Sequence, residues 1–266
     1  MFVDVLSRVT VVVGLMLAVA VVAFVGRGRL LALRREWRSR LRECLPYVVV
    51  LGLVLLLNRV VRWSDDAVWN SVGVYMTETF YALEGEFVGV FQVLASTEVT
   101  AYFSFVYVYG YAFLLAFPVV AYFALPETTS LRRLLVAYSL NYVIGLALYL
   151  LVVAHGPRNV IPDLLGTTLY DANPEYQHLT REVNRATNVF PSLHTSLSVT
   201  VALFAVRTRA AYPRWFPVAL LLAGSVVVST MYLGLHWAVD VVAGIVLAVG
   251  CVALATRIVD RVDDGA

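Results

Sequence analysis

Seven apolar stretches of membrane-spanning length dominate this sequence of 266 residues. Each has roughly the 17–25 residues that an α-helix needs to cross the hydrocarbon core of a bilayer. Backbone N–H and C=O groups inside a bilayer must be hydrogen-bonded internally, so such stretches fold as helices. The composition agrees, because 61% of the residues are hydrophobic and only 14% are charged, whereas soluble domains carry about 25% charged residues. We therefore expect an all-α, polytopic transmembrane helix bundle with about seven spans, at 9–25, 45–61, 99–125, 131–154, 189–206, 216–232 and 236–258.

The arginines indicate how these spans are oriented. Lysine is absent, and arginines gather in alternate connections, with seven in 26–44, two in 126–133, three in 207–215 and two more at Arg257 and Arg261. Cytoplasmic connections carry the excess of basic residues, and the block after the first stretch favours a retained span over a cleaved signal peptide. We expect a multi-pass protein of the cell membrane with its N-terminus outside and its C-terminus in the cytoplasm. The net charge of +2, divided among the connections, gives no indication of a nucleic-acid partner.

Two outer connections are long. In the first, apolar residues recur at three- and four-residue steps from Trp69 to Leu94, which predicts one or two amphipathic helices at about 64–96. These helices either lie in the outer membrane interface or pack against the bundle. The second, 155–188, is the longest polar stretch and contains three prolines and two glycines. A loop of this size is typical of a functional segment.

Polar side chains that could take part in catalysis lie at the outward ends of two spans. His236 and Asp240 are four residues apart, so on a helix they share a face and the carboxylate can fix the imidazole tautomer. His194 follows Pro191 and Ser192 where another span begins, and a helix N-terminus favours an anion. Two histidines, an orienting carboxylate and a helix N-terminus suit phosphoryl transfer, in which one histidine attacks phosphorus and the other protonates the leaving oxygen.

Other interpretations of these residues remain open. His236 and Asp240 would also make a structural hydrogen bond between helices, or bind zinc together with His194. Ser192 equally fits an ordinary N-cap. For phosphate, a cation is needed, and the loop offers Arg158, Arg181 and Arg185. Because arginines and a helix terminus can take the place of a metal, we expect no metal and no cofactor.

These motifs resemble those of the type 2 phosphatidic acid phosphatase superfamily. The similarity covers about residues 131–258 and rests on Pro191-Ser192-Leu193-His194 and on Ser229-x6-His236-x3-Asp240. The resemblance implies a six-span core, here preceded by an N-terminal span. It also implies that His236 is the nucleophile, that Asp240 orients it, that His194 is the general acid and that Ser192 helps to bind phosphate.

Three positions depart from the family pattern. The first motif, Lys-x6-Arg-Pro, is missing, and Gly156-Pro157-Arg158 inverts its Arg-Pro order. Thr230 stands where the third motif has arginine, and Leu193 replaces the usual glycine. Phe-Pro-Ser-Leu-His and Tyr-Leu-Gly-x-His look more like the inositol phosphotransferase branch, related to inositol phosphorylceramide synthase. We expect Arg158 to bind the phosphate, with Arg185 as the second choice.

The resulting expectation is an enzyme that cleaves or transfers the phosphate or phospho-head group of a membrane lipid through a phosphohistidine-type intermediate at the extracytoplasmic face. Water or an alcohol would accept the group, and the shortage of fixed cations favours a singly charged phosphodiester donor. A non-enzymatic lipid-binding or transport protein is the alternative, although the inverted repeats typical of transporters are missing. We divide the chain into an N-terminal span with an arginine-rich cytoplasmic loop, 1–44, and a membrane-embedded catalytic domain, 45–266, with its motifs in 131–258.

Overall fold

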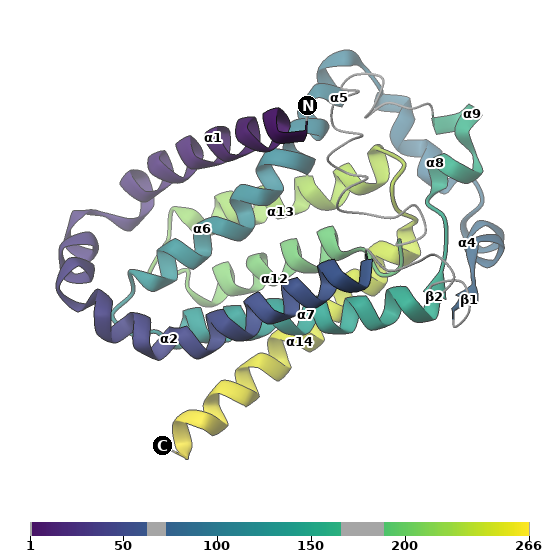
Figure 1. Ribbon diagram of the computed structural model, residues 1–266. Helices are drawn as coiled ribbons and strands as arrows, with labels where there is room; N and C mark the ends of the chain where they lie inside the picture. The colour runs from purple at the N-terminus through teal and green to yellow at the C-terminus, as the bar shows by residue number, and fades with distance from the viewer. Residues whose placement is uncertain (1, 63–72, 166–188, 266) are drawn as a thin grey trace.

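The computed structural model describes residues 2–62, 73–165 and 189–265. Its long helices run back and forth as one bundle (Figure 1). Six of them are long and apolar enough to cross a membrane, which confirms the all-α polytopic class. The bundle helices are α1 (Phe2–Ala20) with a π-helical turn η1 (Val21–Val25), α2 (Arg27–Arg62), α5 (Thr97–Phe105) continued by η3 (Val106–Gly110) and α6 (Tyr111–Phe123), α7 (Thr129–Leu151), α12 (Leu193–Arg207), α13 (Trp215–Tyr232) and α14 (Ala238–Asp264).

Helix α12 is the expected span that falls short, because its 15 residues are fewer than those of the six long helices. It packs against α6, α7, α13 and α14 and is therefore covered by protein on most sides. This shielding explains its polar content. Ser196 donates to Asn141 of α7, and Asn141 donates to Thr200 at 3.2 Å, all three side chains being buried. The hydroxyl groups of Ser196 and Thr200 thus join α12 to α7, as small polar residues do between membrane helices.

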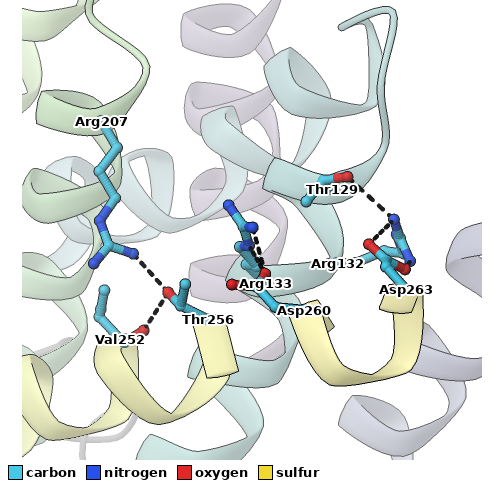
Figure 2. A network of polar contacts seen from close by, with 8 residues as sticks. All are labelled: Thr129, Arg132, Arg133, Arg207, Val252, Thr256, Asp260 and Asp263. Atoms are coloured by element: carbon cyan, nitrogen blue, oxygen red, sulfur yellow. Dashed lines mark hydrogen bonds and ion pairs between the residues drawn. The ribbon is translucent and has the colours of Figure 1, made fainter. Parts of the chain in front are cut away.

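The arginine-bearing segments meet at one end of the bundle. Figure 2 shows Arg132 of α7 paired with Asp263 of α14, Arg133 with Asp260, and Arg207 of α12 donating to Thr256 of α14. In addition, Arg40 of α2 donates to the carbonyl groups of Phe123 and Leu125, and Arg29 donates to that of Ala211. The structure thus has the alternation of helices that the arginine pattern predicts. It differs in one respect: residues 27–44 are not a loop but the first part of α2.

Short elements cover the opposite end of the bundle. They are β1 (Val74–Tyr75), α4 (Thr77–Glu84), the 3₁₀ helix η2 (Phe87–Leu94), β2 (Val152–Val153), α8 (Pro157–Val160) and α9 (Pro162–Leu165). The two helices expected at about 64–96 correspond to α4 and η2; residues 63–72 lie outside the described residues.

A two-stranded parallel ladder also joins the two outer connections. Val74 pairs with Val152 and Tyr75 with Val153. The sequence gives no sign of this pairing, because two residues are too few for a periodic signal and the partners are far apart in the chain. The ladder fixes β1 and the following α4 beside the residues that precede α8.

Candidate active site

His236 lies in a turn that connects α13 to α14. The backbone N–H groups of Leu235 and His236 both donate to the carbonyl of Thr230, at 3.0 and 3.1 Å. Gly234 has a φ of +65°, a conformation that a residue with a Cβ adopts only at a cost. The turn therefore requires glycine. It places His236, which is buried and only 6% exposed, just before the start of α14.

Asp240 contacts both His236 and the start of helix α14. Its Oδ2 atom lies 3.5 Å from His236 Nδ1 and accepts a hydrogen bond from the Trp237 backbone N–H at 2.8 Å. Asp240 is fully buried and is the third residue of α14, where a carboxylate caps the helix and is favoured by its dipole. Because Nδ1 faces the carboxylate, Nε2 is the ring nitrogen left to react with a substrate.

A second carboxylate caps the same helix. Glu84, at the end of α4, accepts the backbone N–H of Ala238 at 2.8 Å and that of Val239 through its other oxygen. Together, Asp240 and Glu84 bind three successive N–H groups at the start of α14, which have no partner within the helix. The indole of Trp237 adds a hydrogen bond to the His155 carbonyl at 2.9 Å. The segment Trp237–Val239 is thus fixed on both sides.

The N-terminus of α12 lies directly against that of α14. Ser192 caps α12, since its side chain accepts the Thr195 N–H at 3.3 Å. Its own backbone N–H donates to the Asp240 carbonyl at 3.0 Å. A Cβ atom added to Gly244 would lie 2.6 Å from the Ser192 carbonyl oxygen, so glycine is needed for this close approach. The two motifs, separated by more than forty residues in the sequence, are therefore in direct contact.

His194 packs against two aromatic rings at this same end of α12. The ring of Tyr107 stacks on its imidazole with centroids 4.3 Å apart and planes 17° apart, and the ring of Tyr111 lies at 4.2 Å. Tyr107 belongs to the π-helical turn η3, and such turns are frequent at functional sites. Leu193, the residue before His194, packs in a buried cluster with Tyr149 of α7, and the guanidinium carbon of Arg62 lies 5.3 Å from the centre of the Tyr149 ring.

Arg158 lies beside the His236 turn. Its backbone N–H donates to the Gly234 carbonyl at 3.0 Å, and its Cβ lies 3.3 Å from the position of an added Cβ on Gly234. Arg158, the expected phosphate ligand, thus contacts Gly234, which precedes His236 by two residues. Arg185, the second choice, lies outside the described residues, as does Arg181. Thr230, which replaces the arginine of the family pattern, donates its hydroxyl to the Val227 carbonyl at 2.7 Å.

Sequence reasoning missed four side chains at this end of the bundle: Glu84, Arg62, and the two tyrosines beside His194, Tyr107 and Tyr111. No local pattern reveals them, because each acts on a residue far away in the chain. The π-helical turn that carries Tyr107 has no recognisable sequence signature either.

Among the described residues, no group of three or more histidine, cysteine, aspartate or glutamate side chains is arranged to hold a metal ion. His236, Asp240 and His194 are thus not grouped as a ligand set in this part of the chain. Their arrangement is that of an oriented imidazole, a second imidazole held by aromatic rings, and nearby arginines. Such an arrangement can accept a phosphate anion and move a proton to or from it.

Comparison with known proteins adds one finding. A family model described as the PAP2 superfamily matches residues 80–254, which include both histidine motifs. Searches of the curated proteins and of the solved structures find no match.

Proposed function

Since the chain belongs to the PAP2 superfamily, a family of membrane phosphatases and phosphotransferases, we propose that it cleaves or transfers the phosphate or phospho-head group of a lipid phosphoester. The observation that carries the proposal is the contact between the two motifs. The Ser192 N–H donates to Asp240, whose carboxylate faces His236, and His194 follows Ser192 by two residues. One lipid phosphate could therefore contact both histidines.

The proposed reaction has two steps. In the first, His236 Nε2 attacks phosphorus, the bond to the lipid alcohol breaks, and His194 gives its proton to the departing oxygen. In the second, His194 takes a proton from water or an alcohol, whose oxygen attacks phosphorus as the P–N bond breaks. Asp240 keeps the His236 proton on Nδ1 and stabilises the positive charge that develops on the ring.

The N-terminus of α12 and cationic side chains would bind the phosphate. Ser192 ends the turn that leads into this helix, and Arg158 is held beside the His236 turn by its backbone. Arg158 would place a guanidinium fork against the non-bridging oxygens. Arg185 remains a second candidate.

The acceptor distinguishes a hydrolase from a head-group transferase of the inositol phosphotransferase type. Thr230 stands in place of a family arginine, and its hydroxyl is engaged with its own helix, so this position supplies no charge. A phosphomonoester carries close to two negative charges at neutral pH and needs more cations than a singly charged diester. This favours a diester donor and an alcohol acceptor as the second candidate function.

Incubation of the purified protein with phosphatidic acid, phosphatidylinositol or a polyprenyl diphosphate, with and without a lipid alcohol, separates these functions. The products are followed by mass spectrometry. Inorganic phosphate from the monoester or the diphosphate alone establishes the phosphatase and excludes the transferase. Transfer of a head group to the added alcohol establishes the transferase. No reaction with any of the three would count for a non-enzymatic lipid-binding or transport protein.

The site is proposed to face the outside of the cell, because the arginine-bearing segments gather at the other end of the bundle (Figure 2). Single cysteines test this in a background where the native pair, Cys44 and Cys251, is replaced. A cysteine at Thr167 should react with an impermeant thiol reagent in intact cells, whereas one at Arg207 should not. The reverse labelling would place the chemistry in the cytoplasm.

A further inference from the structure

Arg62, the last residue of α2, brings a positive charge to the end of α12 that holds His194. Its guanidinium carbon lies 5.3 Å from the centre of the Tyr149 ring on α7. Tyr149 is buried and packs against Leu193, the first residue of α12. Through Tyr149, Arg62 is one buried contact away from Leu193, the neighbour of His194 in the chain.

The position of Arg62 is fixed by the helix that carries it. One turn earlier, the buried side chain of Asn58 donates to the Val54 carbonyl at 3.1 Å and to the Tyr142 carbonyl of α7 at 3.4 Å. Asn58 and Arg62 are four residues apart and so share a face of α2. Tyr142 and Tyr149 are seven apart and share a face of α7. These two contacts hold the end of α2 along α7 and direct Arg62 towards the α12 N-terminus.

We infer that Arg62 is a ligand of the phosphate group that His236 attacks, and that it supplies the charge for which the sequence motifs offer no residue. The inference rests on the proposed function. A protonated His194 and Arg62 carry like charges, which repel each other more strongly in a medium of low dielectric constant than in water. An anion bound between them removes this repulsion and gains charge-assisted hydrogen bonds from both.

The position of Arg62 over the Tyr149 ring suits such a role. A guanidinium group carries its N–H donors at its edge, in a planar fork that matches two phosphate oxygens, and it packs favourably over an aromatic ring. The rival explanation is that Arg62 only covers Tyr149. Lysine and methionine distinguish the two, because both are unbranched and cover the ring with methylene groups, whereas only lysine carries charge.

The experiment measures binding of inorganic phosphate to the purified full chain in detergent by titration calorimetry, together with KM for the best lipid substrate. Arg62→Met should weaken phosphate binding about 10–100-fold, the range for lost hydrogen bonds to a charged group, and should raise KM. Arg62→Lys should recover most of the binding. Arg59→Met is the matched control, since Arg59 is exposed three residues earlier on the same helix, and it should bind phosphate like the wild type.

Two outcomes overturn the inference in different ways. Equal phosphate binding by the lysine and methionine variants, in a protein that still turns over lipid, removes Arg62 from the site and leaves the proposed function intact. A wild-type chain that binds no phosphate and cleaves no phosphoester refutes both. Because the two variants cover Tyr149 alike, a shared loss of thermal stability accompanied by equal binding also counts against the inference.

Discussion

Glu84 offers the sharpest test of how the site is held in place, because a single side chain links α4 to the start of α14. Its two oxygens accept the N–H groups of Ala238 and Val239, beside the residues that orient His236. Replacement by alanine leaves these two donors without a partner. Each such loss costs about 1–3 kcal/mol when the donor is buried, and loss of a helix cap typically costs about 1 kcal/mol.

Because Glu84 is half-buried, water can replace part of the lost bonding, and we take about 2 kcal/mol for the pair, near the lower end of these ranges. For a domain of this size, 1 kcal/mol corresponds to about 2–4 °C in melting temperature, so Glu84→Ala should melt about 4–8 °C lower. Below the melting temperature, kcat should still fall strongly, since a displacement of about 1 Å at a catalytic group can cost about 100-fold in rate.

The assay is thermal unfolding of the detergent-purified protein, followed by kcat measurements well below the melting temperature. Glu78→Ala is the matched control, because Glu78 is an exposed glutamate in the first turn of the same helix α4. It should change stability by less than about 0.5 kcal/mol. Glu84→Gln should lie between the two, since the amide keeps one acceptor oxygen. If Glu84→Ala and Glu78→Ala melt and turn over alike, the carboxylate does not hold α14, and the capping argument fails.

The remaining predictions concern the reacting groups. His236→Ala should abolish turnover of every substrate, whereas His194→Ala should retain more activity on a nitrophenyl ester, whose leaving group needs no proton; equal losses on both leaving groups would refute this division of roles. Asp240→Asn should stay folded, because its amide oxygen can still accept the Trp237 N–H, but kcat should fall about 10²–10⁴-fold through the wrong imidazole tautomer. Tyr107→Phe should keep full activity, while Tyr107→Ala should lose about two- to tenfold in kcat, the equivalent of one aromatic contact; an alanine variant with the wild-type kcat would show that the stacking is dispensable.

The sequence predicts the bundle well because its signal is local. Apolar length alone identifies the six long helices, and the arginine pattern predicts which connections share an end of the bundle. The prediction is least accurate at the starts of two helices: α2 begins at Arg27 rather than at 45, and α12 begins at Leu193 rather than at 189. In α12 the reason is that Pro191 and Ser192 form the turn and cap that precede the helix.

Of the candidate site, the sequence predicts only the proposed reacting groups. His194, His236 and Asp240 can be named because their residue types and spacing carry the chemistry. Arg62 and Glu84 cannot, because their roles depend on which distant segments meet. Glu84 caps a helix that begins 154 residues later, and Arg62 reaches this end of the bundle because α2 runs parallel to α7 and ends beside Tyr149 (Figure 1).

The three helices that meet at the site are also joined at their far ends, and the two kinds of contact contribute unequally to their alignment. At the arginine end, Arg132 and Asp263 form an ion pair in which the aspartate is 38% exposed, and exposed pairs contribute about 0–1 kcal/mol. At the site end, a Cβ on Gly244 would collide with the Ser192 carbonyl, and one on Gly145 with the Leu193 side chain. Such overpacking costs about 1–3 kcal/mol. The buried glycine contacts therefore set the spacing of α7, α12 and α14 around the histidines, whereas the exposed ion pair adds little to it.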